Sequence, residues 1–303
     1  MGKKVAIIIT TCNQPKLVGK CLASIKKKND YKNYKVYLVD DSGEGEIGKE
    51  IKEKFKWVDV EINKTNIGTT KSMNLCIKKS FKEYNPDYIL HLDDDTEFIE
   101  KDCLKKMVDV AESNKKIGIL GCKLIYPEGD LQWFFKNRKM HFMNVKKDIL
   151  ETKETFQIEE VEAIIGACFL IKRAVIDEIG LYDEKFSPIY GEETDLCYRA
   201  RDKGFKMIYV GNTKMSHFNH GSKAKPEENF GRWFLQKRHG IRCEWLNFNI
   251  FNIIKHTIIH FGSVILSKNP FEKLKLLLRG YKENLNNLKE IKQKRKERFS
   301  WKI

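Results

Sequence analysis

The sequence predicts an α/β fold in which a mostly parallel central sheet is flanked by helices and followed by a C-terminal helical extension. Two observations lead to this prediction. The first 126 residues alternate apolar runs with segments of helical periodicity, which is typical of a parallel sheet covered by helices. Beyond residue 230 the periodicity is helical, and basic residues become frequent. We therefore divide the chain into a sheet domain at 1–225 and a basic, amphipathic helical region at 226–303.

The first half of the chain supplies most of the strands. Residues 3–10, KKVAIIIT, contain the continuous apolar run VAIII, as expected of a strand that is buried on both faces. Further runs predict strands at 34–41, 58–63, 88–93 and 117–126. Between them, helical segments are expected at 15–28, where Pro15 marks the start, and at 69–81.

The second half is less regular. Residues 127–160 carry no interpretable pattern. Strand-like apolar sequence returns at 161–173, and a last short strand is expected at 206–211. Between these strands, 191–205 has the pattern of a helix that begins with acidic residues and ends at Gly204.

The net charge of +15 needs an explanation, because 41% of the residues are hydrophobic and the chain is therefore not a disordered polyelectrolyte. Residues 268–303 hold twelve Lys and Arg against four Glu. Such a segment suits a polyanion, either a membrane surface or a nucleic acid. The alternative is a solvated helix that only keeps the protein in solution.

The eight cysteines are scattered and form no CxxC pair, and most lie in apolar segments. This pattern predicts reduced thiols in the core of a cytosolic protein and argues against a zinc or disulfide framework. The apolar run near the N-terminus has no small-residue cleavage site, so we expect a first strand there and not a signal peptide.

Polar side chains follow three of the predicted strands at the point where each strand ends. They are Thr10, Thr11, Cys12 and Asn13 after the first strand, Asp40 and Asp41 after the second, and Asp93, Asp94 and Asp95 after the fourth. Ligands of such sheets bind at the carboxyl ends of the strands. We therefore expect these residues to share one site.

Asp93 and Asp95 form an Asp-x-Asp pair directly after a strand. Three adjacent carboxylates repel one another, and hard oxygen ligands on a short loop suit Mg²⁺ or Mn²⁺. The pair thus predicts a divalent metal site. The alternative is a hydrated acidic turn that caps a helix near residue 100.

Two further segments are candidates for nucleotide binding. Asp40 and Asp41 at a strand end can accept hydrogen bonds from a base or a ribose, or can form an Asx turn before Gly43. Asn66, Gly68 and Lys71 are expected at a helix start, where backbone amides and one cation can meet a phosphate.

Glu192, Glu193 and Asp195 are expected at the N-terminus of another helix. Acidic residues there complement the helix dipole, or one of them acts as a general base for a hydroxyl group. His217 and His220 are either metal ligands or ordinary polar residues of the surface.

Taken in order, these motifs resemble glycosyltransferase family 2. The matching segments are IIITTCN, VDDSG, NIGTTKSMN, LDDDT, GACFLIKRAVIDEIGLYDEKF, GEETDLCYR and the spacing of His and Ser in HFNHGS, over roughly residues 3–221. The last third is most similar to the bacterial and archaeal rhamnosyltransferase-like branch. The resemblance implies a GT-A fold, which is Rossmann-like, with a nucleotide-sugar-binding catalytic domain at 1–225.

The resemblance also implies a reaction. The expected activity is a metal-dependent, inverting transfer of a hexosyl or deoxyhexosyl group from a nucleoside-diphosphate sugar, with UDP or dTDP as the nucleotide. The acceptor is expected to be a hydroxyl of a glycan or a lipid-linked glycan, contacted by 127–160 and the C-terminal region. The alternatives are another metal-dependent sugar-nucleotide enzyme, such as a nucleotidyltransferase, and a non-catalytic polyanion-binding protein. A nucleic-acid partner would explain the charge but not the three polar strand ends.

Roles for single positions follow from the same resemblance. Thr10, Cys12 and Asp41 would lie along the nucleoside, with Asp41 at the pyrimidine, and Lys71 would lie near the diphosphate. Asp93 and Asp94 would border the ribose and the metal, Asp95 would be the principal metal ligand, and His217 would complete the metal site. Glu193 stands where the family usually carries an aspartate base. The longer side chain leaves Glu192 and Asp195 as alternatives, and Cys12 replaces the commoner tyrosine that stacks on the base.

The C-terminal region contains two apolar stripes at helical spacing. Residues 246–266 are interrupted by Asn, Lys and His, so they are not expected to cross a bilayer. A second stripe at 271–291 is flanked by Lys and Arg, which is typical of a helix that lies in a membrane interface. We expect a cytoplasmic protein that is peripheral on the cytoplasmic face of an anionic membrane; the alternative is that both stripes pack on protein.

Overall fold

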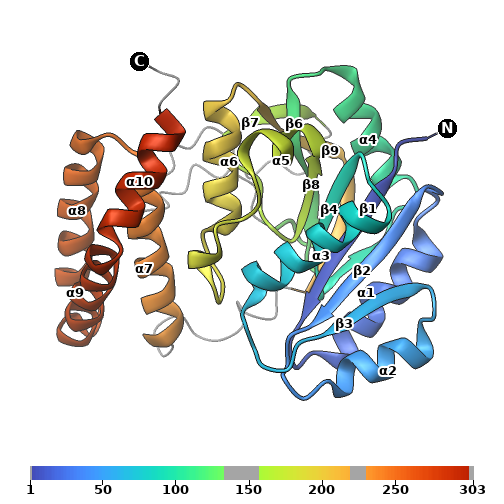
Figure 1. Ribbon diagram of the computed structural model, residues 1–303, viewed down its shortest axis with the longest axis horizontal. Coiled ribbons are helices and arrows are strands. Elements are labelled where there is room, and N and C mark those ends of the chain that lie inside the picture. The colour runs from blue at the N-terminus through green and yellow to red at the C-terminus, as the bar shows by residue number, and fades with distance from the viewer. Residues whose placement is uncertain (1, 133–156, 219–229, 300–303) are drawn as a thin grey trace.

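The computed structural model describes residues 2–132, 157–218 and 230–299. These residues form one mixed, nine-stranded sheet that is flanked by helices, with four further helices packed beside it at the C-terminal end (Figure 1). The α/β fold with a C-terminal helical extension is therefore as predicted.

The N-terminal half of the sheet is parallel. It contains β1 (Val5–Thr11), β2 (Tyr34–Asp40), β3 (Val58–Ile62) and β4 (Tyr88–Asp93), in the spatial order β3-β2-β1-β4. The register pairs Thr11 with Asp40 and Thr10 with Asp93. The polar ends of three strands therefore meet at one edge of the sheet, as the sequence predicts.

The second half of the sheet is mixed, which the sequence did not predict. It contains β5 (Thr96–Phe98), β6 (Ile117–Ile125), β7 (Ile158–Val161), β8 (Cys168–Lys172) and β9 (Lys206–His217). β8 lies between β4 and β6 and is antiparallel to both. The chain reaches β8 from β7 without a crossover helix, so nothing in the connection requires a parallel strand. β9 continues six residues beyond the predicted end at 211 and reaches His217.

Helices cover both faces of the sheet, and β1 explains why its sequence is apolar throughout. Val5, Ile7 and Ile9 pack into the core on one face, whereas Ala6 and Ile8 pack into the core on the other. The first face is covered by α1 (Pro15–Lys28), α2 (Glu46–Lys54) and α4 (Cys103–Ser113). The second is covered by α3 (Thr69–Glu83), α5 (Arg173–Ile179) and α6 (Glu192–Asp202). All eight cysteines are free thiols, and seven are buried.

The C-terminal helices are α7 (Phe230–Asn247), α8 (Ile250–Ile265), α9 (Pro270–Asn286) and α10 (Leu288–Phe299). α7 packs against α6, α9 and α10, and α8 packs beside α9 at the far end of the molecule (Figure 1). The predicted domain boundary at 225 falls outside the described residues. No helix in the described part of the chain is long and apolar enough to span a bilayer.

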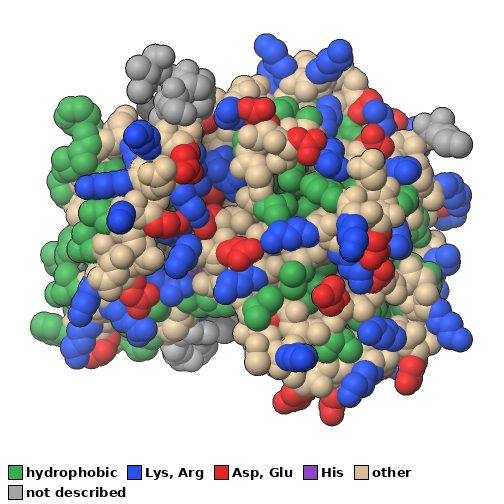
Figure 2. All heavy atoms as spheres, viewed as in Figure 1, with side chains coloured by type: hydrophobic (Ala, Val, Ile, Leu, Met, Phe, Trp, Pro, Cys, Tyr) green, Lys and Arg blue, Asp and Glu red, His purple; other side chains and the backbone are tan. Residues whose placement is uncertain are grey.

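Both apolar stripes of this region are partly exposed. Of the second stripe, Phe271, Leu278 and Leu285 are exposed, whereas Ile291 is buried, and α10 is tied to α7 by an ion pair of Arg242 with Glu290 at 2.8 Å. Most of the first stripe, on α8, faces outward as well, and Figure 2 shows apolar side chains along the side of the molecule where α8 lies. Residues 268–299 are therefore not a free basic tail.

Candidate active site

Two carboxylates and an imidazole meet at one edge of the sheet. Asp93 ends β4, Asp95 lies in the turn to β5, and His217 ends β9. Antiparallel pairing of β5 with β9 places Thr96 opposite His217 and so brings the imidazole to the turn. The Nε2 atom of His217 lies 3.2 Å from Asp95 Oδ1 and 3.8 Å from Asp93 Oδ2. The structure thus brings together the three residues that the sequence predicts as metal ligands.

Gln132 orients this imidazole. Its Oε1 lies 2.7 Å from His217 Nδ1, and its Nε2 donates to the backbone oxygen of His217. If Nδ1 carries the proton and donates it to Gln132, the lone pair of Nε2 faces the two carboxylates, which is the tautomer a metal ligand needs. The side chain of Gln132 is buried. It lies in the stretch 127–160, where the sequence has no pattern, so no local signal identifies it.

The charges at this edge call for a cation. The pKa of Asp94 is raised to about 7. Burial is the largest cause, and the charges of Asp95 and Asp93 add to it, whereas the hydrogen bond of 2.6 Å from the Thr11 hydroxyl lowers the pKa. Burial lowers the pKa of His217, but the hydrogen bond and charge of Asp95 and the charge of Asp93 outweigh burial, so the pKa is raised. A divalent cation would remove both perturbations. The donor set, two or three carboxylates with one oriented imidazole, therefore fits such an ion.

Glu192 and Glu193 begin α6, as predicted, and their surroundings differ. Glu193 lies directly against Gly166, where a Cβ atom would stand 2.0 Å from Glu193 Oε1, so only glycine leaves room for the carboxylate. Burial raises the pKa of Glu193, although the charge of His91 opposes this. Glu192 is buried, and burial and the charge of Glu193 raise its pKa well above its usual range. Glu193 is the more accessible of the two and the better candidate for a base.

Asp195 has a different environment, although it is only two residues further along α6. It is fully buried, and its carboxylate accepts from Arg199 Nε at 2.8 Å and from Arg298 Nη1 at 2.9 Å. Burial raises its pKa, but the two guanidinium groups outweigh burial and hold the pKa far below its usual range. A carboxylate held in this way is a poor base. It connects α6 to α10 instead.

Asp41 shapes the loop before α3. Its carboxylate accepts hydrogen bonds from the backbone N–H groups of Ile67 and Gly68, at 2.9 and 2.8 Å, and from the side chain of Asn63 at 2.7 Å. Gly68 has a positive φ of 89°, and a Cβ atom there would stand 2.7 Å from the Cα of Pro188. The carboxylate of Asp41 is thus already engaged by three donors. Its contact with a pyrimidine remains a prediction.

Asp40 forms the Asx turn that was the alternative to nucleotide binding. Its carboxylate accepts from the backbone N–H of Ser42 at 3.0 Å and from that of Gly48 at 2.7 Å. The side chain is fully buried. Asp40 therefore fixes the start of α2 beneath the site.

The end of β1 borders the metal cluster. Thr11 donates to Asp94, and Thr10 lies opposite Asp93 in the sheet. Cys12 is exposed, and Asn66 Nδ2 lies 3.3 Å from its sulfur. Asn13 has a positive φ of 58°. This strand end and the loop around Asn66 thus face each other, as expected of two walls of one binding site.

Two buried residues that we did not predict lie between Asp93 and the acidic start of α6. His91 Nε2 is 3.5 Å from Asp93 Oδ1, and the ring of His91 packs edge to face on Tyr182 at a centroid distance of 6.3 Å. Burial raises the pKa of Tyr182, and the charges of Glu193 and Glu192 raise it further. His91 interrupts the apolar run YILHLD, and that interruption is the one sequence signal for this buried polar layer.

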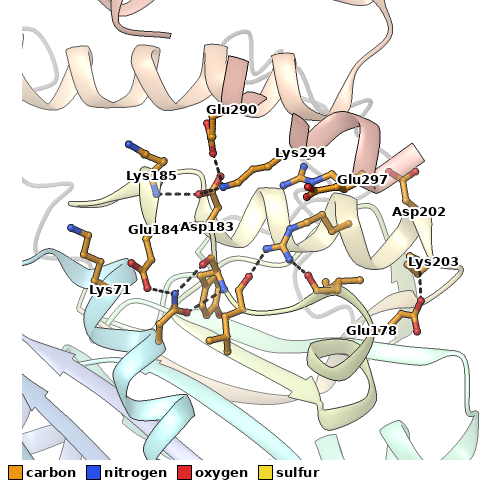
Figure 3. A pocket seen from close by; sticks show the side chains of 16 residues that line it. Lys71, Glu178, Asp183, Glu184, Lys185, Asp202, Lys203, Glu290, Lys294 and Glu297 are labelled. Carbon is orange, nitrogen blue, oxygen red and sulfur yellow. Dashed lines mark hydrogen bonds and ion pairs between the residues drawn. The ribbon is translucent and has the colours of Figure 1, made fainter. Parts of the chain in front are cut away.

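Lys71, the predicted diphosphate ligand, lines a separate cavity of about 810 Å³ (Figure 3). This cavity lies between α3, residues 178–185, α6 and α10, and none of the metal-site residues lines it. Charges pair across it, as Asp183 Oδ1 does with Lys294 Nζ at 2.8 Å. We interpret the cavity as the seam between the sheet and the C-terminal helices. The role of Lys71 at the diphosphate stays a prediction.

His220 and residues 133–156 lie outside the described residues.

Comparison with known proteins identifies one matching family. A family model described as "Glycosyltransferase like family 2" matches residues 3–236. The O-antigen biosynthesis protein RfbC of Myxococcus xanthus is 23% identical over 238 residues, which are 75% of this chain and 18% of that protein. The uncharacterized protein y4gI of Sinorhizobium fredii is 21% identical over 230 residues, which are 73% of this chain and 25% of that protein. The chain thus spans about a fifth to a quarter of the length of these curated relatives.

Two solved structures share the fold. The crystal structure of GalNAc-T7 with UDP, GalNAc and Mn²⁺ matches with a TM-score of 0.65 at 15% identity, over 92% of this chain and 55% of that one. The crystal structure of S. aureus TarS matches with a TM-score of 0.52 at 17% identity, over 85% of this chain and 42% of that one. At these identities the likeness concerns the fold, which is GT-A.

Proposed function

The chain belongs to glycosyltransferase family 2, and we propose that it is a metal-dependent, inverting enzyme that transfers a sugar from a nucleoside-diphosphate donor to a hydroxyl group. One observation carries the proposal. The cluster of Asp93, Asp95 and His217 and the base candidate Glu193 are linked by the buried layer of His91 and Tyr182. An inverting transferase needs these two functions, a site for the diphosphate charge and a base, and no covalent nucleophile.

Asp93, Asp95 and His217 would hold Mn²⁺ or Mg²⁺. The imidazole, which is softer than the carboxylates, favours Mn²⁺ of the two. A bound cation supplies Lewis-acid stabilisation of the charge that develops on the leaving diphosphate. Gln132 keeps His217 in the ligating tautomer, and Thr11 holds Asp94 at the rim. The presence of UDP and Mn²⁺ in the crystal structure of GalNAc-T7 supports a UDP-type donor and this ion.

Glu193 would accept the proton of the acceptor hydroxyl. The hydroxyl oxygen attacks the anomeric carbon, and the nucleoside diphosphate leaves from the opposite face of the sugar. Burial favours the neutral form of the Glu193 carboxyl and thereby increases its basicity, while His91 limits this effect. Gly166 keeps the space that the side chain occupies. Base assistance of this kind contributes about 10²–10⁴-fold.

The acceptor is proposed to be a glycan or a lipid-linked glycan. The name of the Myxococcus relative, an O-antigen biosynthesis protein, supports a role in polysaccharide assembly. A lipid-linked acceptor would place the enzyme at the cytoplasmic face of a membrane, and the net charge of +15 favours an anionic surface.

A donor screen tests this function. The purified chain is incubated with UDP-, dTDP- and GDP-sugars, with Mn²⁺ or with EDTA and with water as the acceptor, and free nucleoside diphosphate is measured. We expect release from at least one donor with Mn²⁺ and none with EDTA, and the Glu193→Gln variant should bind that donor without turning it over. Release that is independent of metal, or that survives in Glu193→Gln, would contradict the mechanism.

A further inference from the structure

Helix α8 buries two histidines and exposes most of its large apolar side chains. The inner side carries His256 and His260, which are 3% and 2% exposed and both contact the carboxylate of Glu244. The outer side carries apolar residues at helical spacing. They are Ile250, Phe251, Ile254, Ile258 and Ile265, and Leu266 follows directly. We call these six residues the α8 face.

The α8 face is far more exposed than is usual for such side chains. Phe251 is 80% exposed, Ile258 is 68% exposed and Leu266 is 89% exposed. α9 packs beside α8 and exposes three more large apolar side chains, Phe271, Leu278 and Leu285. Figure 2 shows apolar side chains gathered along that side of the molecule. Monomeric soluble proteins rarely expose patches of more than a few hundred Å² unless something binds there.

The charges around the α8 face indicate what binds. Residues 245–271 contain no Asp or Glu, but they contain Lys255 and Lys268, both exposed. Lys282 is exposed on α9, and so is Lys275, which is paired with Glu272. An apolar helix face with a basic border complements an anionic lipid surface. A two-fold contact between two copies would instead bring this basic border against itself.

We propose that the α8 face docks this protein on an anionic lipid bilayer, with the helix lying in the interface. No described helix can span a bilayer, so the contact is superficial. The apolar side chains supply most of the binding, and the lysines add a smaller, salt-sensitive part. This differs from docking through residues 268–303 as a free basic tail, because α9 and α10 pack on α7. The idea that the bilayer carries the acceptor rests on the proposed function, but the docking itself does not.

Vesicle flotation tests the proposal without donor or acceptor. The purified chain is mixed with vesicles of phosphatidylcholine, with or without 30% phosphatidylglycerol, at 0.1 M and 1 M NaCl. We expect it to float with the anionic vesicles and to remain partly bound in 1 M NaCl. The double variant Phe251→Glu/Ile258→Glu should lose at least about tenfold in affinity for the vesicles. Burying each of these apolar side chains in lipid stabilises the bound state by more than the free energy that corresponds to a factor of ten in Kd. Ile158→Glu on β7, an exposed apolar residue elsewhere, is the matched control and should bind like wild type.

A fluorescent variant covers the case in which two glutamates disturb the helix. Phe251→Trp keeps the face apolar, and brominated lipids should quench its emission only if residue 251 enters the bilayer. Failure of wild type to float, equal binding of the double variant, or the absence of quenching would overturn the proposal. So would a dimer in light scattering that Phe251→Glu dissociates, because a second copy would then cover the face. Each of these outcomes leaves the donor screen unaffected, so the two proposals can fail separately.

Discussion

The sheet and the C-terminal helices differ in where their charged side chains lie. In the sheet, the interior is apolar on both faces, and charged residues gather at the carboxyl ends of the strands. In the helical region, buried residues include Lys237, Arg242, Glu244, His256 and His260, while large apolar residues of α8 face outward. The comparison indicates that charge in the sheet serves the reaction, whereas charge in the helices holds the structure together.

Geometry supports this division. Glu244 lies 2.9 Å from His256 Nδ1 and 3.3 Å from His260 Nε2, and Arg242 lies 2.7 Å from Asp183. These groups are paired and buried, so they do not face a substrate. Around the metal cluster, in contrast, like charges lie together, and the pKa values of Asp94 and Glu193 are raised. A mutation at the metal cluster should therefore change activity. A mutation at a buried charge of the C-terminal helices should change stability.

Glu193→Gln should produce the largest effect on activity. The amide cannot accept the proton, so kcat should fall by about 10²–10⁴-fold, while donor affinity and the free energy of unfolding stay close to wild type. The checks are steady-state kinetics, donor titration and urea unfolding. A variant that loses stability and not turnover would place Glu193 with the structural charges.

Asp195→Asn tests the same boundary from the other side, two residues further on. The neutral side chain leaves Arg199 and Arg298 without their buried counter-charge, so the free energy of unfolding should fall by about 3–5 kcal/mol. Turnover per folded molecule should change little, and urea unfolding together with kinetics at low temperature measures both. If kcat falls as in Glu193→Gln while the protein stays folded, the base has been assigned to the wrong carboxylate.

Asp95→Asn should remove most activity and leave the fold intact. An amide is a poorer ligand for a hard cation, and loss of metal assistance corresponds to about 3–4 kcal/mol, or about 10²–10³-fold in kcat. Mn²⁺ binding, measured by calorimetry, should weaken in parallel. Asp102→Asn, at an exposed acid on the N-terminal side of α4, is the control and should keep both. Full activity of Asp95→Asn, or of wild type in EDTA, would contradict metal dependence.

The same contrast explains which parts of the molecule the sequence could predict. A run such as KVAIIITT has one explanation, a strand buried on both faces, and the strand ends at Thr10, Asp40 and Asp93 follow from it. Gln132 and Gly166 could not be identified, because their roles depend on His217 and Glu193, which are distant in sequence. In α7 and α8, buried charges break the hydrophobic pattern, so periodicity could give the helices but not which side faces the protein.

Acid should destabilise the packing of the C-terminal helices. Burial raises the pKa of Asp183, but the charges of Arg242 and Lys294 outweigh burial and lower it below its usual range. Burial also raises the pKa of Glu244, but His256 and His260 outweigh burial and lower it. A carboxyl whose pKa is lower in the folded state stabilises the protein above its unfolded-state pKa and loses this contribution as the pH falls through the folded-state value. Stability should therefore decline below about pH 4.

Thermal unfolding across pH 3 to 7 measures this effect. In Asp183→Asn the decline should be shallower than in wild type, because one of the titrating groups is gone. Identical slopes in the two proteins would show that Asp183 does not contribute to the pH dependence.

Lys237→Met should stabilise the protein, and it is the smallest effect that we expect. Lys237 is 1% exposed, its Nζ has no hydrogen-bond partner among the described residues, and it stands 5.3 Å from the ring of Trp233. Burial lowers its pKa from 10.5 to about 8, which Glu244 opposes and Lys273 reinforces. Such a shift destabilises the folded state by about 3 kcal/mol at pH 7. The contact with Trp233 returns part of this, so methionine should gain about 1–3 kcal/mol.

The pH dependence makes this prediction specific. A lysine whose pKa is lower in the folded state destabilises fully below that pKa, and the effect vanishes as the pH rises through the unfolded-state value. The gain of Lys237→Met should therefore be largest near pH 7 and shrink between about pH 8 and 10.5. Lys275→Met, at an exposed residue paired with Glu272, should change stability by less than about 0.5 kcal/mol at every pH. A loss of stability in Lys237→Met would mean that this buried ammonium has a structural partner after all, and that the helical region satisfies every charge that it buries.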